Sequence, residues 1–161
     1  MLSLTRKADY AFVAMAELAQ RSPDRVSARE IAETIRVSLP MLTNVLHQLH
    51  QYGLVSATKG SKGGYRLAKV PEDISLADMI DAMQGPFRLV ACCASERGAD
   101  GPECDIEDSC RIKEPVRRVH RGLREYLSQI KLADLAFGSE LVTCGLPETS
   151  SRGGSGPETA A

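Results

Sequence analysis

Four of the five cysteines lie in one stretch, ACCASERGADGPECDIEDSC, which has neither helical nor strand-like periodicity. They are Cys92, Cys93, Cys104 and Cys110. Thiolates bind iron and zinc strongly, and ligands in a loop between helices can converge on one centre without breaking a hydrogen-bond ladder. Because adjacent side chains diverge, Cys92 and Cys93 cannot easily both bind. The spacing therefore predicts three cysteine ligands and a fourth position for another group.

Several interpretations of these cysteines compete: an iron–sulfur cluster, a thiol–disulfide redox switch, a structural zinc site, or no site at all. Zinc favours short paired spacings such as CxxC, which this stretch lacks. We therefore favour the cluster, then the redox switch. The fifth cysteine, Cys144, lies where apolar periodicity has faded, and we interpret it as a bystander.

The first twenty residues lack the uninterrupted apolar core of a signal peptide, because Arg6, Lys7 and Asp9 precede a short apolar run that Glu17 interrupts. No stretch reaches the roughly 18 apolar residues of a membrane span. We expect a cytoplasmic protein without a membrane partner. In a reducing cytosol, clustered cysteines are more often metal ligands or redox thiols than structural disulfides.

The chain has 161 residues, 43% of them apolar, which suits one compact domain with a helical extension. Its net charge of -1 hides an asymmetry, because residues 1–70 carry 10 Lys+Arg against 5 Asp+Glu, whereas residues 71–161 carry 10 against 16. A basic N-terminal part suits binding to a polyanion such as nucleic acid.

A long amphipathic helix is predicted directly after the cysteines. Apolar residues recur there at helical spacing: Ile112, Val116, Val119, Leu123, Leu127 and Ile130. The opposite face is basic, with Arg117, Arg118, Arg121 and Arg124. At about 1.5 Å per residue this helix would be roughly 30 Å long, as long as a small domain is wide. We expect it to pack against a second copy in a two-fold homodimer rather than wholly within one chain.

Three helices are predicted in the basic part, over residues 5–20, 27–37 and 38–52. The second opens with the serine and glutamate spacing of a capping box. The third has Pro40 in its first turn and Gly53 at its end. Its apolar face is expected to point inward: Leu39, Leu42, Val45, Leu46 and Leu49. Its outer face is uncharged and rich in amides: Thr43, Asn44, His47, Gln48 and Gln51.

Two short helices joined by a tight turn, the second with such a face, are typical of a helix-turn-helix that reads base edges in the major groove. An ordinary helical hairpin is the alternative. Two strands are predicted next, over 54–57 and 65–67, with Lys59 and Lys62 in the glycine-rich connector between them. A basic wing of this kind can bind phosphates or enter the minor groove, and a hairpin made soluble by its charges is the alternative.

A short helix over 75–83, ended by Gly85-Pro86, separates the wing from the cysteines. These elements and four motifs jointly resemble the IscR/NsrR/SufR family of bacterial winged-helix repressors. The motifs are MLSLTRKADYAF, KGSKGGYRLA, EDISLADMIDAMQGP and the CDIEDSC that precedes the long helix. The resemblance covers about residues 1–136 and is closest to the branch that regulates SUF-type iron–sulfur assembly.

The resemblance implies a mainly α fold with a small β wing. It divides the chain into a winged helix-turn-helix over 1–84, a cysteine loop over 85–111 and a dimerisation helix over 112–136. The end, over 137–161, is rich in Gly, Pro and Ser and is predicted to be disordered.

The family's three cysteines hold a cluster, which implies Cys92, Cys104 and Cys110 as ligands here, with Cys93 as the alternative to Cys92. A 2Fe-2S cluster is favoured and a 4Fe-4S cluster is the alternative. Some members use a histidine three residues after the last cysteine, where this chain has Lys113. Others use an aspartate near the start of the first helix, from the partner subunit, and Asp9 matches that position. An exposed first-turn carboxylate is the other interpretation of Asp9. His120 is interpreted as a packed or surface histidine.

For binding to double-stranded DNA, the resemblance implies contacts from residues at the start of the third helix: Ser38, Pro40, Thr43 and Asn44. We add His47, which lies on the outer face of the same helix. In the wing it implies a second set: Lys59, Lys62, Gly63, Gly64 and Tyr65. Lys59 stands where some members have an arginine that enters the minor groove.

The sequence therefore predicts a homodimeric transcription regulator that binds a palindromic operator and senses iron–sulfur cluster status, controlling iron–sulfur assembly genes. One alternative is a thiol- or nitric-oxide-sensing repressor on the same scaffold. Another is a non-regulatory iron–sulfur or zinc protein. An enzyme is not expected, because no convergent acid–base pair and no nucleophile with a partner base is recognised.

Overall fold

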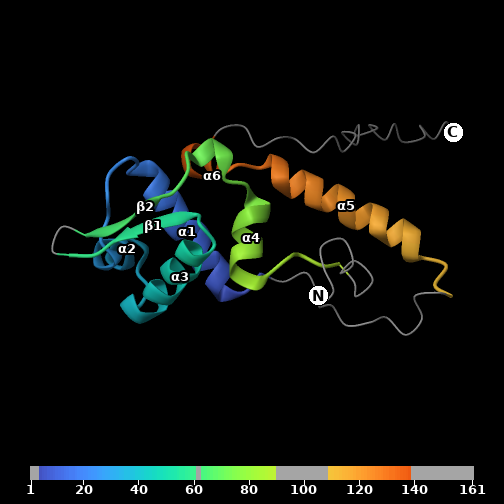
Figure 1. Cartoon of the computed structure of the whole chain (residues 1–161), viewed down its shortest axis with the longest axis horizontal. Coiled ribbons are helices and arrows are strands. Elements are labelled where there is room, and N and C mark those ends of the chain that lie inside the picture. The colour runs from blue at the N-terminus through green and yellow to red at the C-terminus, as the bar shows by residue number, and fades with distance from the viewer. Residues whose placement is uncertain (1–3, 61–62, 90–108, 139–161) are drawn as a thin grey trace, which may run out of the picture.

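The computed structural model of this chain describes residues 4–60, 63–89 and 109–138. Figure 1 shows a body formed by the first three helices and a small sheet, with one long helix extending away from it. The order of elements is α1 (Arg6–Gln20), α2 (Ala28–Ile35), α3 (Leu39–Gln51), β1 (Val55–Thr58), β2 (Gly64–Leu67), the 3-10 helix η1 (Pro71–Asp73), α4 (Leu76–Gln84), α5 (Lys113–Gln129) and α6 (Leu132–Phe137). The predicted mainly α fold with a β wing is confirmed.

The helix ends follow from local hydrogen bonding. The capping box of α2 is present: the Ser27 hydroxyl accepts the Glu30 N–H at 3.2 Å, and the Glu30 carboxylate accepts the Ser27 N–H at 2.9 Å. Ser38 occupies the cap position of α3, but its side chain makes no capping hydrogen bond. Gly53 follows α3 with a φ of 76°, the left-handed conformation that ends helices.

The core lies where α1, α3 and α4 meet. Buried residues of α1 and α3 supply much of it: Ala8, Ala11, Ala14, Met15, Leu18, Leu42, Val45, Leu46 and Leu49. The prediction that Leu39 points inward is wrong, because its side chain is 38% exposed. Leu39 is the first residue of α3, where the helix has not yet reached the body that covers its later turns.

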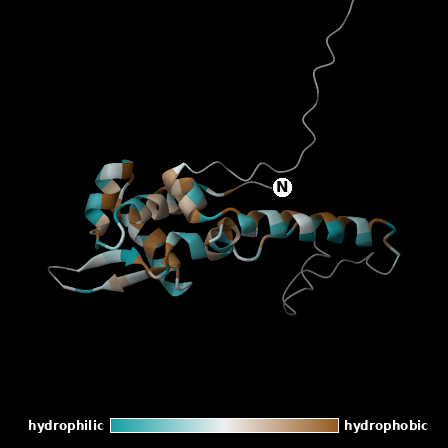
Figure 2. Ribbon diagram, turned by 90° about the horizontal axis from the view of Figure 1, so that it is seen from above, coloured by the Kyte–Doolittle hydropathy of each residue, from teal (hydrophilic) through white to brown (hydrophobic). Residues whose placement is uncertain are grey.

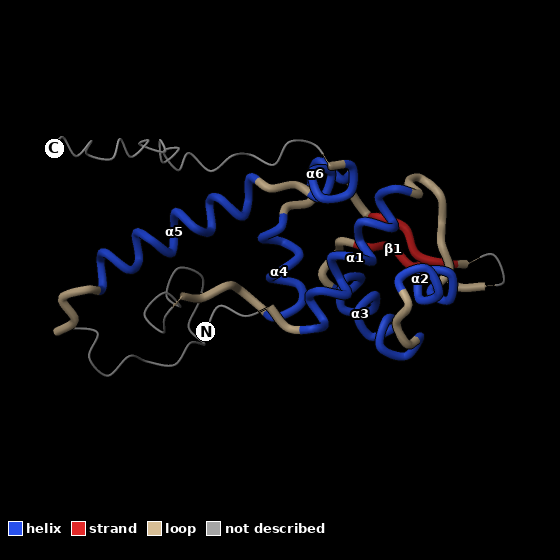
Figure 3. Tube along the Cα trace, turned by 180° about the vertical axis from the view of Figure 1, so that it is seen from behind, coloured by secondary structure: helices blue, strands red, loops and turns tan. Residues whose placement is uncertain are grey.

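The sheet is a two-stranded antiparallel hairpin whose register runs from Val55↔Leu67 to Thr58↔Gly64. Figure 3 shows it beside α1 and α2. A residue of the loop between α1 and α2 joins its edge: Val26 N–H donates to the Tyr65 carbonyl at 2.9 Å, and Tyr65 N–H donates to the Val26 carbonyl at 2.8 Å. This bridge anchors the hairpin to the helices.

The segment 112–136 forms two helices rather than one. α5 ends at Gln129, the chain turns at Ile130, and α6 packs back against α1, where Leu132 is fully buried. The Gln20 side chain donates to the Ala136 carbonyl at 3.1 Å. The chain after α5 therefore returns to the N-terminal body, as Figures 1 and 3 show. The predicted disordered end lies, from residue 139 onward, outside the described residues.

α5 keeps the amphipathic pattern predicted for it, and apolar and polar residues alternate along its ribbon in Figure 2. Two of its predicted apolar positions are exposed: Val119 is 60% exposed and Ile112, the residue before its first turn, is 65% exposed. Within the described ranges, no helix has the length and apolar character needed to cross a membrane.

Candidate nucleic-acid interface and metal centre

The turn between α2 and α3 places α3 at the surface. Arg36 adopts the left-handed conformation at the end of α2, and Val37 N–H donates to the Ala32 carbonyl at 3.0 Å. Such a residue reverses the chain within a few positions, so that α3 begins at Leu39 and packs across α2. The two helices and their turn form the predicted helix-turn-helix geometry.

The predicted reading residues of α3 share an exposed surface. Ser38, Pro40, Thr43, Asn44 and His47 are all exposed, while the opposite side of the helix is buried. The Thr43 hydroxyl donates to the Leu39 carbonyl at 2.8 Å, which leaves its oxygen free to accept a further hydrogen bond. This surface combines amide, hydroxyl and imidazole groups without a carboxylate, and it can therefore approach a polyanion without repulsion.

In the wing, the structure gives two of the predicted residues a conformational role. A Cβ on Gly63 would collide with the Thr58 carbonyl oxygen, and a Cβ on Gly64 would lie 2.7 Å from the Val26 carbonyl oxygen. Any other residue would force the main chain apart at these positions. Lys59 is exposed at the end of β1, Tyr65 is half-buried, and Lys62 lies outside the described residues.

His50 was not singled out from the sequence, yet it joins the two predicted reading elements. Its Nδ1 lies 2.9 Å from the carbonyl oxygen of Val55. Since a carbonyl only accepts, the ring carries its hydrogen on Nδ1 and donates it. The last turn of α3 is thereby tied to the first residue of β1. A histidine near the end of a helix is too common a feature to have indicated this contact.

Of the predicted cluster ligands, two lie in the described part of the chain. Cys110 has a free, half-buried thiol just before α5, and its carbonyl accepts the Lys113 N–H at 3.3 Å. Asp9 is exposed in the first turn of α1. Cys92, Cys93 and Cys104 lie outside the described residues. Within the described residues no group of three or more His, Cys, Asp or Glu side chains is arranged to hold a metal ion.

The sequence indicated that His120 is either a packed or a surface histidine, and the structure shows it packed. It is 4% exposed, and its ring stacks on Phe87 with centroids 5.6 Å apart and planes inclined by 15°. Its Nδ1 has no hydrogen-bond partner among the residues that the structure describes.

An ion pair joins α4 to α5, in which the Asp81 side chain is buried and the Arg124 side chain is 30% exposed. The sequence indicated only that Arg124 lies on the face opposite the apolar stripe. Arg124 Nη2 lies 2.6 Å from Oδ2 of Asp81, and Arg124 Nη1 lies 3.4 Å from Oδ1. The hydrogen bonds with Asp81 raise the pKa of Arg124 against the opposing effect of burial. Asp81 also accepts the Phe87 N–H at 3.1 Å. The partners are 43 residues apart, so that no local pattern could indicate the pair.

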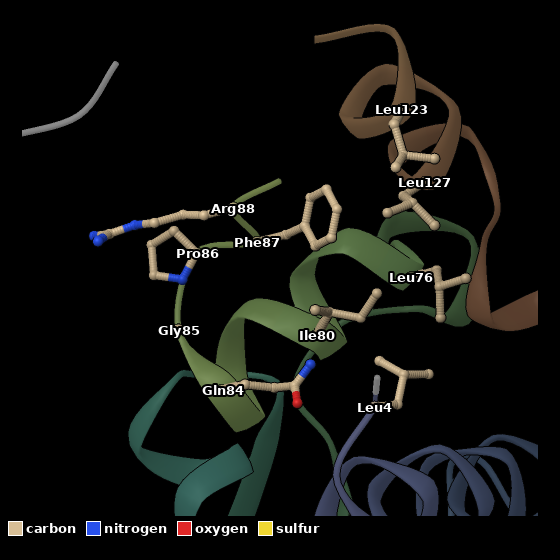
Figure 4. Close-up of a pocket in the computed structure, with 10 residues that line it drawn as sticks. All are labelled: Leu4, Leu76, Ile80, Gln84, Gly85, Pro86, Phe87, Arg88, Leu123 and Leu127. Carbon is tan, nitrogen blue, oxygen red and sulfur yellow. The ribbon is translucent and has the colours of Figure 1, made fainter. Parts of the chain in front are cut away.

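Beside this ion pair, α4, α5 and the turn after α4 line a partly open apolar cavity of about 340 Å³. Figure 4 shows Ile80 of α4 and Leu123 and Leu127 of α5 at its walls, with the Phe87 ring between the two helices and the Arg88 side chain directed away. Leu4, just before α1, closes another side.

Comparison with known proteins identifies the fold and the class of protein. The chain matches the Rrf2 family, described as "Iron-dependent Transcriptional regulator", over residues 4–137. It is similar to the HTH-type transcriptional regulator NsrR of Shouchella clausii, at 29% identity over 140 residues, or 86% of this chain and 91% of that protein. It is 30% identical to NsrR of Halalkalibacterium halodurans over 135 residues, or 83% and 90% of the two chains.

Solved structures agree with these relatives. CymR (YrzC), the global cysteine regulator of B. subtilis, superposes with a TM-score of 0.65 at 27% identity, covering 87% of this chain and all of that one. T. potens IscR superposes with a TM-score of 0.60 at 30% identity, covering 86% and 89%. With its helix-turn-helix, its two-stranded wing and a match over most of its length, the chain belongs to the Rrf2 family of winged-helix transcriptional regulators.

Proposed function

We propose that this regulator is a homodimer that binds a palindromic operator, senses iron–sulfur cluster status and controls iron–sulfur assembly genes. The observation that carries the proposal is the continuous Rrf2 match over residues 4–137. This match includes α3, the wing, α5 and the residues 88–112 that contain the predicted cysteine ligands, here called the cysteine segment. The description of that family as iron-dependent regulators supports iron as the signal.

The proposed DNA contacts divide between specificity and affinity. Hydroxyl and amide groups of Thr43 and Asn44 suit hydrogen bonds to base edges in the major groove, flanked by Ser38, Pro40 and His47. Lys59 and Lys62 suit phosphates, which add affinity without sequence information. Tyr65, Gly63 and Gly64 would hold the wing in the shape that presents these lysines.

The homodimer is supported by the exposed apolar residues of α5. Ile112 and Val119 are 65% and 60% exposed, and both belong to the apolar stripe that should face a second copy. Two-fold pairing through α5 would place two α3 helices on two half-sites related by the same symmetry, hence a palindromic operator.

The donor set fits an iron–sulfur cluster, because thiolate-rich sets select such clusters and Cys110 presents a free thiol next to α5. We assign Cys92, with Cys93 as its alternative, Cys104 and Cys110 as ligands, and Asp9 of the second copy as the fourth. When bound, the cluster supplies a crosslink that is lost on oxidation or iron shortage. Cys110 would then tie the start of α5 to the segment after α4 and so bias the spacing of the two α3 helices. A coupling of about 1–3 kcal/mol corresponds to a roughly 5- to 150-fold change in affinity.

The test is anaerobic purification of wild type, Cys104→Ala and the matched control Cys144→Ala. Each protein is characterised by its visible spectrum, its iron and sulfide content and its affinity for an operator selected from random double-stranded DNA. We expect a coloured wild type and Cys144→Ala, a bleached Cys104→Ala, and a change in operator affinity that follows the cluster. Equal operator affinity with and without cluster would overturn the sensing mechanism while leaving DNA binding in place.

A second candidate function is thiol sensing on the same scaffold. It is favoured by the likeness to Staphylococcus aureus CymR, one structure of which is described as the oxidized form, with a TM-score of 0.58 at 25% identity over 84% of this chain. Diamide would take two electrons and two protons from a pair of thiols as their disulfide forms, and dithiothreitol would reverse this. A reversible change in operator affinity of cluster-free protein would support this candidate, and none would exclude it.

A further inference from the structure

The attachment of α5 to the body is sparse. Among the 17 residues of α5, His120 alone is buried, and Figure 1 shows the helix leaving the body along most of its length. The end of the helix is held by the main chain, because Leu76 N–H donates to the Ile130 carbonyl at 2.9 Å. The direction of the other turns therefore depends on a few side-chain contacts with α4 and with the turn that follows it.

Within the described part of the chain, one buried carboxylate, that of Asp81, makes several of these contacts. Asp81 of α4 is 7% exposed. Its Oδ2 accepts from Arg124 Nη2 at 2.6 Å, while its Oδ1 accepts from Arg124 Nη1 at 3.4 Å and from the Phe87 N–H at 3.1 Å. A buried carboxylate is stable only with such donors around it, and the two-pronged guanidinium fixes direction as well as distance. Asp81 thus holds α5 and the turn after α4 in one arrangement.

The same contact links Phe87, the residue directly before the cysteine segment, to α5, the helix that follows it. Residues 88–112, which contain every predicted cysteine ligand, begin directly after Phe87 and end directly before α5. Phe87 reaches Asp81 through its amide and stacks on His120 of α5 through its ring. A conformational change in the segment that moves Phe87 would therefore alter its contacts with both α4 and α5.

Among the described residues, apolar packing does not fill the space beside this contact. The cavity of about 340 Å³ lies between Ile80 of α4 and Leu123 and Leu127 of α5 (Figure 4). A close-packed interface resists reorientation because each side chain fills its neighbour's gap, whereas an open one leaves room for a second arrangement. Among the described contacts, the polar contact at Asp81 is therefore one that can favour a single angle.

We propose that Asp81 is a positioning residue that fixes the angle between α5 and the winged-helix body by binding both Arg124 and the Phe87 amide. It thereby transmits the state of the cysteine segment to the spacing of the two recognition helices. The inference rests on the proposed function in two respects, namely that α5 pairs two copies on DNA and that the cysteine segment senses a cluster.

The test compares wild type with Asp81→Asn and Arg124→Gln. Arg118→Gln is the matched control, because it makes the same change at an exposed position of α5. Arg124→Lys is a second variant that keeps the charge and loses the two-pronged geometry. The probe is an operator selected by wild type from random double-stranded DNA, together with versions in which the spacer between half-sites is lengthened or shortened. Iron and sulfide content and thermal unfolding are measured on every protein.

We expect all variants to fold and to load iron and sulfide as wild type does. In Asp81→Asn and Arg124→Gln, the cluster-dependent change in operator affinity should fall from the roughly 5- to 150-fold range of coupled sites to below about twofold. Both should also accept altered spacers that wild type and Arg118→Gln reject. Should Arg124→Gln unfold, Arg124→Lys is expected to show the same relaxed spacing.

Wild-type selectivity for spacer length in Asp81→Asn and in both Arg124 variants would overturn the inference. The two proposals fail separately. A wild type that binds the operator equally with and without cluster overturns the sensing function. The spacer series still tests the positioning role of Asp81. Relaxed spacing in the variants would then support the positioning role of Asp81, and unchanged spacing would overturn it.

Discussion

Ser27 and Glu30 close the first turn of α2, the helix that supports α3. Hydrogen bonding from the Ser27 amide, and then from the Ser27 side chain, lowers the pKa of Glu30, and the charge of Arg21 acts in the same direction. The ionised carboxylate is therefore favoured in the folded chain. Although this pair is small and exposed, it fixes the residue at which the helix-turn-helix begins.

This pair predicts a pH-dependent stability. Because the folded pKa of Glu30 lies below its ordinary value of 4.5, its contribution is present above pH 4.5 and is lost as pH falls through the folded pKa. Glu30→Gln should lower the melting temperature at neutral pH, and the difference from wild type should shrink in increasingly acid buffer. Circular dichroism melts over a pH series measure it. Glu33→Gln, exposed on the same helix, is the control, and a Glu30 effect that does not change with pH would contradict the assignment.

Among the elements, the geometry between α3 and the wing matters most for DNA reading. Hydrogen-bonded contacts help to set it: His50 joins α3 to β1, and the bridge between Val26 and Tyr65 joins the wing to the helical body. A winged-helix protein must present both elements to one stretch of duplex at the same time. We therefore expect the contact at His50 to act on DNA affinity through the position of the wing.

Substitution of His50 separates hydrogen bonding from ring packing. The side-chain amide of Asn places its N–H at about the position of Nδ1, whereas that of Gln lies one bond further out. We expect His50→Gln and His50→Ala to weaken operator binding by roughly 2- to 10-fold, in line with the about 0.5–1.5 kcal/mol of one hydrogen bond. His50→Asn should retain wild-type affinity in fluorescence anisotropy titrations. An Asn variant as weak as the Ala variant would contradict the positioning role.

At the scale of the whole molecule, two functions lie at opposite ends. The wing forms one end of the long axis and the start of α5 the other, with α4 between them (Figure 1). A long arm amplifies angular change: a small rotation at Asp81 displaces the far end of α5 more than its near end. This geometry suits a regulator in which the pairing of two copies sets the separation of their reading surfaces.

The proposed pairing through α5 predicts how a negative charge at Val119 would affect dimerisation. Val119→Glu should shift sedimentation equilibrium from dimer towards monomer and weaken binding to a palindromic operator, because burying an unpaired carboxylate in an apolar interface is unfavourable. Arg118→Gln, the neighbouring exposed residue, changes the net charge by the same amount and should remain dimeric. A dimeric Val119→Glu protein would place the pairing surface elsewhere.

Local patterns were sufficient for the helix ends, the hairpin and the candidate ligands. The capping box, Gly53 and the apolar repeat of α5 depend on residues only a few positions apart, where backbone geometry alone brings side chains together. Residue type and spacing indicated three cysteine ligands, whereas the choice of Cys92, Cys104, Cys110 and Asp9 followed from the family resemblance. As ligands they stay a prediction. The assignment of Thr43 and Asn44 to DNA reading is likewise a prediction, now supported by their exposure on α3.

Other features required the folded chain. The return of α6 to α1, the bridge from Val26 to Tyr65 and the ion pair of Asp81 with Arg124 join segments far apart in sequence. Amphipathic periodicity predicts which face of a helix is buried but not against which partner. It therefore placed Arg124 opposite the apolar stripe without indicating its contact with Asp81. Short sequence windows thus determine the type of each element and suggest its chemistry. The angle of α5 and the contact between Asp81 and Arg124 arise only when distant segments pack.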